Sequence, residues 1–151
     1  CGQDHGFMPV VVIAKEPAEY EKWITEIEAK QEAARQREQE LLSMEMSKEE
    51  LMDLGEKVYN STCAACHQPN GQGVNGVFPA LAGSGVAVDP EAKSKHIDIV
   101  VNGVSGTAMQ AFGQQLSMQE LAAVITYERN AWGNETGDLI QAADINKVMN
   151  Q

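Results

Sequence analysis

Two cysteines and a histidine lie close together in the segment CAACH at residues 63–67. Cysteine pairs at this spacing serve as redox dithiols, as halves of zinc sites, or as thiols that bond covalently to a haem. The redox interpretation requires a βαβ context and the zinc interpretation requires a second ligand pair, and neither pattern surrounds the segment. Because a histidine directly follows Cys66, the motif predicts haem c attached through Cys63 and Cys66, with His67 as an iron ligand.

A second axial ligand to the iron is expected among the seven methionines, because methionine often completes the coordination of haem in electron carriers. Met109 lies at the end of a glycine-rich stretch that begins at Asn102, between two apolar periodic segments. Such a loop lets the backbone approach a flat cofactor closely. Met118 falls in the first turn of a predicted helix and is better explained as a core or surface residue. The sequence therefore favours Met109, with a gap-filling core methionine as the alternative.

Further residues around the motif fit one family. A proline, Pro79, follows His67 in the segment FPAL, and the segment MQAFG covers residues 109–113. A glycine and two aromatic residues occupy predicted first and last helices: Gly55, Tyr59 and Tyr127. As a set, these residues resemble a class I cytochrome c domain over about residues 48–134. The resemblance implies that the Pro79 carbonyl accepts the ring proton of His67.

The resemblance also implies an all-α fold around the haem. Capping boxes at residues 47–50 and 117–120 and the helix-start signal Asp89-Pro90 predict three of its helices. Apolar side chains from the loop after the motif, from the helix near residue 97 and from the methionine loop are expected to wall the haem: Phe78, Pro79, Leu81, Ile97, Val100, Val101 and Phe112. His96, beside this stripe, is expected to be a surface or partly buried helix residue rather than a competing iron ligand.

The first eight residues, CGQDHGFM, contain a thiol, an imidazole and a thioether, which together are the ligand set that copper favours. They resemble the end of the binuclear copper (CuA) loop of cytochrome oxidase subunit II. The resemblance implies that Cys1, His5 and Met8 are part of a copper site that is incomplete in this chain, with copper bound only in the full-length subunit. Two alternatives for Cys1 are the lipid anchor of a mature lipoprotein and an unpaired thiol.

These resemblances predict four regions. Residues 1–16 would be the truncated end of a CuA (cupredoxin-like) domain, in which 9–14 form one orphan β-strand. Residues 17–46 would be a long connector helix, because good helix formers dominate and glycine is absent. Residues 47–134 would be the cytochrome c domain. Residues 135–151, which show no clear period, would be a C-terminal tail that packs partly on that domain.

The formal net charge of −11 argues against nucleic acid or an anionic membrane surface as a partner. No apolar stretch approaches the roughly 20 residues of a membrane span. The expected location is the periplasmic or extracytoplasmic face of a membrane, because covalent attachment of haem is associated with that side. The resemblance to oxidase subunit II implies that the chain is anchored there by transmembrane helices outside this sequence.

The expected function is one-electron transfer from a donor cytochrome or reductase to the CuA centre of a terminal haem–copper oxidase. The partners would be oxidase subunit I and the missing N-terminal part of subunit II. The chain would then belong to an enzyme, cytochrome c oxidase, while being itself an electron carrier with no catalytic residue. Two alternatives remain: a free-standing, membrane-anchored lipoprotein cytochrome c, and a haem peroxidase or gas sensor with an open iron position.

Overall fold

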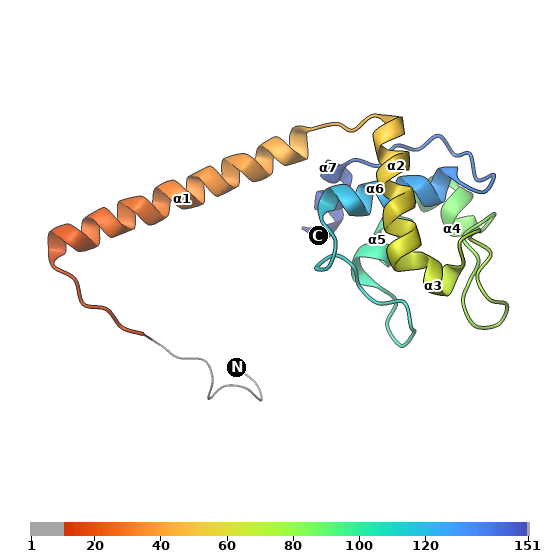
Figure 1. Ribbon diagram of the computed structural model, residues 1–151, viewed down its shortest axis with the longest axis horizontal. Helices are drawn as coiled ribbons and strands as arrows, with labels where there is room; N and C mark the ends of the chain where they lie inside the picture. The colour runs from red at the N-terminus through yellow and green to blue at the C-terminus, as the bar shows by residue number, and fades with distance from the viewer. Residues whose placement is uncertain (1–10, 151) are drawn as a thin grey trace. The chain divides into compact units, whose positions relative to one another are not determined.

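The computed structural model describes residues 11–150 (Figure 1). By their internal contacts, the described residues up to Glu38 and those from Gln39 onwards form two units. Residues 11–16, in the first unit, are irregular. The orphan strand predicted over residues 9–14 is therefore wrong for its described part, 11–14, and its first two residues lie outside the described range. The physical reason is that a strand needs a neighbouring strand for its backbone hydrogen bonds, and the described residues contain only one isolated bridge, between Val74 and Phe78.

Most of the region predicted as a connector, residues 17–46, is helical: α1 runs over Pro17–Ser43, and none of its residues is buried. Proline suits the first position of a helix because its missing N–H would have no partner there. Glu32 and Arg35 form an exposed pair at 2.6 Å, which is worth little in water. The helix ends at Ser43, four non-helical residues follow, and a new helix begins at Lys48.

The predicted capping box at the start of α2, Lys48–Val58, is confirmed. The Ser47 hydroxyl accepts a hydrogen bond from the Glu50 N–H at 3.3 Å, and the Glu50 carboxylate accepts one from the Ser47 N–H at 2.8 Å. Hydrogen bonds from Ser47 lower the pKa of the Glu50 carboxyl. After α2 the chain makes one π-helical turn, Tyr59–Cys63, and then the short helix α3, Ala64–His67. Such π-turns are frequent at functional sites.

The remaining helices complete an all-helical unit within the described residues. They are α4 (Gly85–Val88), the 3₁₀ turn η3 (Pro90–Ala92), α5 (Lys93–Asn102), α6 (Met118–Asn130) and α7 (Ala142–Met149). Helix α6 starts with the second predicted capping box, in which Ser117 and Glu120 exchange hydrogen bonds. None of the helices over residues 11–150 combines the length and the apolar character that crossing a membrane requires.

The two helices that pack most extensively on each other are α2 and α6, which cross in Figure 1. They meet at Gly55, where a Cβ atom would overlap the Ala123 carbonyl oxygen and the Tyr127 Cβ. Only glycine permits this close approach. The core around the crossing consists mainly of aliphatic side chains from four helices and the segment before α7: Leu51, Val58, Ile97, Val100, Leu121, Val124, Ile125, Ile140 and Ile145.

One C-terminal feature differs from the sequence prediction. The segment predicted as a tail contains α7, and Ile140 and Ile145 are completely buried. Their burial depends on the surface that α5 and α6 present, which local periodicity does not reveal. Helix α6 ends at Asn130, so Trp132 lies outside it with a φ of 56°.

Candidate functional site

The CAACH motif lies where the π-turn passes into α3. Cys63 ends the π-turn, while Cys66 and His67 belong to α3. Both thiols are free and half-buried. A spacing of three residues along helical backbone puts the two thiols on the same face, one above the other. The local fold therefore presents the cysteines as a pair, as covalent attachment to one flat group requires.

The His67 ring is oriented by a backbone carbonyl. Its Nδ1 lies 2.9 Å from the Pro79 carbonyl oxygen. Because a carbonyl can only accept, Nδ1 carries the proton and donates it, which leaves the Nε2 lone pair available to a metal. The contact predicted between His67 and Pro79 is therefore confirmed.

The loop that carries this carbonyl returns close to the motif. The Gly73 N–H donates to the His67 carbonyl at 2.8 Å. A Cβ atom at Gly73, whose φ is +61°, would overlap the carbonyl oxygens of Phe78 and Pro79. Glycine at this position therefore lets two backbone segments close on each other beside the His67 ring.

A buried acidic side chain lies beside Cys63. Burial raises the pKa of the Cys63 thiol, and the carboxylate of Glu128 raises it further. Glu128 accepts a hydrogen bond from His96 Nε2 at 2.8 Å, and both side chains are almost fully buried. The expectation that His96 would be at the surface or partly buried is therefore wrong. The helical spacing of Leu121, Ile125 and Glu128 is the signal that could have revealed the burial of Glu128.

The Met109 loop folds back on the end of α5. The Met109 carbonyl accepts from the Val104 N–H at 2.9 Å, and its N–H donates to the Thr107 hydroxyl at 3.1 Å. Further along, Phe112 and Gly113 donate backbone hydrogen bonds to carbonyls of α5. Met109 packs, half-buried, against the hydrophobic core. Met118, the alternative, is the first residue of α6 and also contacts the core.

The residues predicted to wall a haem divide into two groups. Four are buried in the core cluster: Ile97, Val100, Val101 and Phe112. Three belong to the loop beside His67: Leu81 packs partly against the core, Phe78 is half-buried, and Pro79 is exposed. Their role as a haem wall stays a prediction.

Three aromatic rings connect the π-turn after α2, helix α6 and the segment after α6. Tyr59 lies 5.6 Å from Tyr127 and 4.7 Å from Trp132, measured between ring centroids, and Tyr127 meets Trp132 edge-on at 5.3 Å. The Tyr59 hydroxyl donates to the Gln68 carbonyl at 2.7 Å. Burial raises the pKa of both tyrosines. The cluster thus ties the helix crossing to the residue that follows His67.

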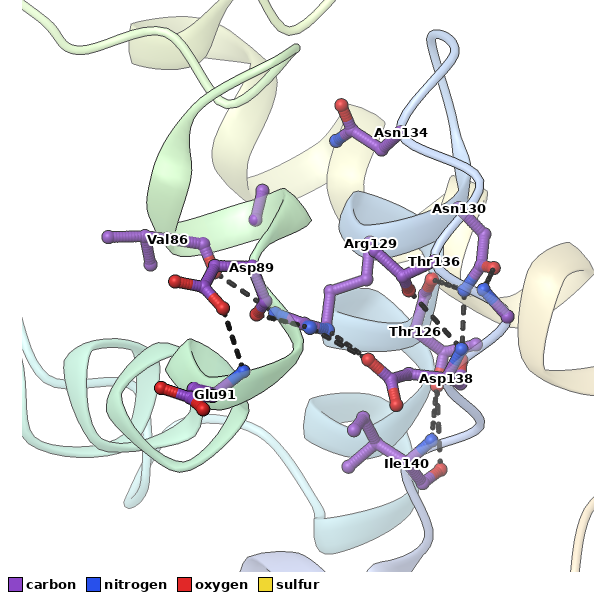
Figure 2. Close-up of polar contacts among 12 residues, drawn as sticks. Val86, Asp89, Glu91, Thr126, Arg129, Asn130, Asn134, Thr136, Asp138 and Ile140 are labelled. Carbon is purple, nitrogen blue, oxygen red and sulfur yellow. Dashed lines mark hydrogen bonds and ion pairs between the residues drawn. The ribbon is translucent and has the colours of Figure 1, made fainter.

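Sequence reasoning missed a buried guanidinium, which Figure 2 shows at the centre of a polar network. Arg129 is fully buried and donates to the Asp138 carboxylate at 2.7 and 2.9 Å. It also donates to the carbonyls of Val86 and Asp89, at 3.0 and 2.9 Å. One side chain of α6 therefore holds the α4 region and the segment before α7. An arginine flanked by polar residues gave no sequence signal of burial.

The donor set suits haem c. Two paired thiols, an imidazole whose Nδ1–H is already bonded, and a thioether on a tightly closed loop are the groups that covalent attachment and two-sided iron ligation need. The predicted copper ligands Cys1, His5 and Met8 lie outside the described residues. Among residues 11–150, no group of three or more His, Cys, Asp or Glu side chains is arranged to hold a metal ion.

Comparison with known proteins agrees with this donor set. Residues 50–127 match the family described as cytochrome c oxidase, cbb3-type, subunit III. The cytochrome c subunit of alcohol dehydrogenase (quinone) from Gluconobacter oxydans is 36% identical over 102 residues, which are 62% of this chain and 21% of that protein. Cytochrome c-552 of Thermus thermophilus is 34% identical over 91 residues, which are 53% of this chain and 69% of that protein.

A third relative covers most of the chain. The cbb3-type cytochrome c oxidase subunit CcoP of Azospirillum is 31% identical over 147 residues, 90% of this chain and 45% of that protein. The chain spans about a fifth of the length of the dehydrogenase subunits that it matches. These findings support the cytochrome c part of the sequence prediction and give no support to a fusion with a copper-binding oxidase subunit II. The chain belongs to the cbb3-type cytochrome c oxidase subunit III family, and it contains a cytochrome c domain.

Proposed function

We propose that this domain carries single electrons through a haem c attached at Cys63 and Cys66, with His67 and Met109 as the axial ligands of the iron. When bound, the haem supplies the one-electron couple of its iron. The observation that carries the proposal is the hydrogen bond from His67 Nδ1 to Pro79, because it leaves Nε2 free beside a pair of thiols. The match to a cytochrome family supports it.

The protein's own groups would set how readily the iron changes its oxidation state. The Pro79 carbonyl makes the His67 imidazole a stronger donor, which favours the oxidised iron. A thioether from Met109 raises the reduction potential relative to a nitrogen ligand. The buried side chains of Ile97 and Val100 would exclude water, which favours the less charged, reduced iron. With both axial positions filled by protein, electron transfer is favoured over peroxidase chemistry or gas binding.

The partners that we propose are a dehydrogenase, reductase or cytochrome as donor and an oxidase or second cytochrome as acceptor. The support is that relatives are named as subunits of dehydrogenases and of an oxidase, and that cytochrome c-552 is named as a cytochrome alone. Under this proposal the chain is an electron carrier at the extracytoplasmic face of a membrane. This proposal has the broader support of the comparisons.

A second candidate acceptor is a CuA centre, and a separate observation favours it. The spacing of Cys1, His5 and Met8 fits the end of a CuA loop. In this version the end of a copper domain lies at residues 1–16 and the cytochrome domain at 47–134. A connector joins the two at residues 17–46, and a tail that packs on the cytochrome domain follows at 135–151. The coding sequence upstream separates the two candidates: a second bridging cysteine and a histidine indicate a copper domain, and a lipoprotein signal indicates the anchored carrier.

The haem proposal is tested by denaturing the purified protein after expression with a haem-attachment system. The wild type should keep its haem through acidified solvent extraction, whereas Cys63→Ala with Cys66→Ala should lose all of it. Cys1→Ser is the matched control, because it removes the one cysteine outside the motif, and it should keep the haem. Complete extraction of haem from the wild type would contradict the proposal.

A further inference from the structure

The side chain of Asn134 joins the end of α6 to the loop beside His67. Its Oδ1 accepts a hydrogen bond from the Gly83 N–H at 2.8 Å. Its Nδ2 donates to the carbonyls of Leu81, at 3.3 Å, and Glu128, at 2.5 Å. One donor faces the oxygen and two acceptors face the nitrogen, so the reverse amide orientation would satisfy none of these groups. Asn134 is therefore bound through every polar group that its side chain offers.

The loop that Asn134 holds is the one that orients His67. The Pro79 carbonyl, which accepts the His67 proton, lies two residues before Leu81. On the other side, the Leu81 and Ala82 N–H groups donate to the Gly71 carbonyl at 2.7 and 2.9 Å. The loop is thus fixed by backbone bonds from the motif side and by the Asn134 amide from the α6 side.

The position of Asn134 is itself fixed by neighbouring aromatic packing. Trp132 adopts a left-handed φ of 56°, which is unfavourable for a bulky residue, and its ring packs on Tyr59 and Tyr127. The Asn134 N–H then donates to the Ala131 carbonyl at 3.0 Å. Asn134 is only 9% exposed. Because water cannot readily replace a buried amide, losing this side chain would leave its partners without hydrogen bonds.

We propose that Asn134 is a positioning residue for electron transfer: it holds the 79–83 loop so that the Pro79 carbonyl stays on the Nδ1–H of His67. This inference rests on the proposed function, in which His67 ligates the iron. The Nδ1 hydrogen bond raises the basicity of the ligating imidazole and stabilises the oxidised iron. Loosening the loop would therefore expose the Nδ1 proton to exchange with water and raise the reduction potential.

The same helix offers a matched control. Asn130 makes the same three kinds of hydrogen bond: its Nδ2 donates to the carbonyls of Thr126 and Asp138, at 2.8 and 2.9 Å, and its Oδ1 accepts from the Gly137 N–H at 2.9 Å. Figure 2 shows this side chain turned towards Thr126 and Asp138. Asn130 holds the segment before α7 and makes none of these three bonds to the 79–83 loop. Replacing Asn130 by alanine therefore removes three comparable hydrogen bonds and leaves the hydrogen bonds from Asn134 to the 79–83 loop in place.

The experiment compares Asn134→Ala with Asn130→Ala in the haem-loaded protein. Neither change alters charge, so the reduction potential is not displaced by a new carboxylate. Proton NMR of the reduced, diamagnetic form follows exchange of the His67 ring proton with water. We expect exchange to be about tenfold faster or more in Asn134→Ala and within about twofold of wild type in Asn130→Ala. The potential should rise in Asn134→Ala alone.

Equal exchange rates in the two variants would overturn the proposal, as would a potential in Asn134→Ala that is unchanged or lower. If Asn134→Ala fails to fold, Asn134→Ser supplies the same comparison, because its short hydroxyl cannot reach both carbonyls at once. Failure of the haem proposal is visible separately. In that case the wild type itself loses its haem on extraction.

Discussion

Glu128 and His96 form a buried pair across two helices, joined by a hydrogen bond of 2.8 Å between the carboxylate and Nε2. The pair lies in the apolar core between α5 and α6, and the carboxylate also acts on the Cys63 thiol. His96 Nδ1 has no hydrogen-bond partner within the described protein. Burying such groups is costly unless each is paired, so the core depends on both members.

Removing the carboxylate alone should destabilise the domain strongly. Glu128→Ala leaves His96 buried without an acceptor, and we expect a loss of about 3 kcal/mol in the free energy of unfolding. Glu128→Gln keeps an acceptor oxygen and should lose only about 1 kcal/mol. Chemical denaturation of the haem-loaded variants measures both. Equal losses in the two variants would show that the hydrogen bond to His96 contributes little.

Replacing the proposed sixth ligand should open the iron without releasing the haem. In Met109→Ala the two thioether bonds and His67 remain, so the haem should survive extraction. The variant should bind carbon monoxide and have a lower reduction potential, because water, a harder ligand than the thioether, favours the oxidised iron. Met118→Ala is the control and should resemble the wild type. Carbon monoxide binding by Met118→Ala but not by Met109→Ala would reverse the assignment.

The cap of α6 should make stability depend on pH in the acid range. Hydrogen bonds from Ser117 lower the pKa of the Glu120 carboxyl below its ordinary value. The ionised group therefore contributes stability above the pKa of the unfolded chain, and this contribution is lost as the pH falls through the lower, folded pKa. At neutral pH Ser117→Ala should cost about 1 kcal/mol, and its difference from wild type should shrink below about pH 4. Chemical denaturation at a series of pH values measures this difference in unfolding free energy. Ser94→Ala, at an exposed position, is the control.

The close crossing of α2 and α6 should not tolerate a methyl group. In Gly55→Ala the new Cβ would overlap the Ala123 backbone, so the helices must separate. We expect a loss of about 1–3 kcal/mol in unfolding free energy. Gly85→Ala is a matched control in α4, because a Cβ there meets no atom within 4 Å, and its stability should be unchanged or slightly higher. A neutral Gly55→Ala would mean that the crossing can relax freely.

Several features were predictable because they depend on neighbours in the chain. Both capping boxes lie within four residues, and the connector helix follows from its uninterrupted helix formers. The predicted strand over residues 9–14 is wrong in its described part, because a strand depends on a partner elsewhere in the chain. Residues 11–14 are apolar enough for a strand, but a strand forms only against another strand, and the described chain offers none there.

The sequence by itself determined the reactive groups of the site, a thiol pair with an adjacent imidazole, and its resemblance to a cytochrome c domain implied the proline whose carbonyl accepts from that imidazole. Only the tertiary structure decided which distant residues support it. The partnership of His96 with Glu128, the bonds of Asn134 to the 79–83 loop, and the burial of α7 each join segments far apart in the chain. The physical reason is that a buried polar group is stable only beside its partner, and which partner it meets depends on how the helices cross.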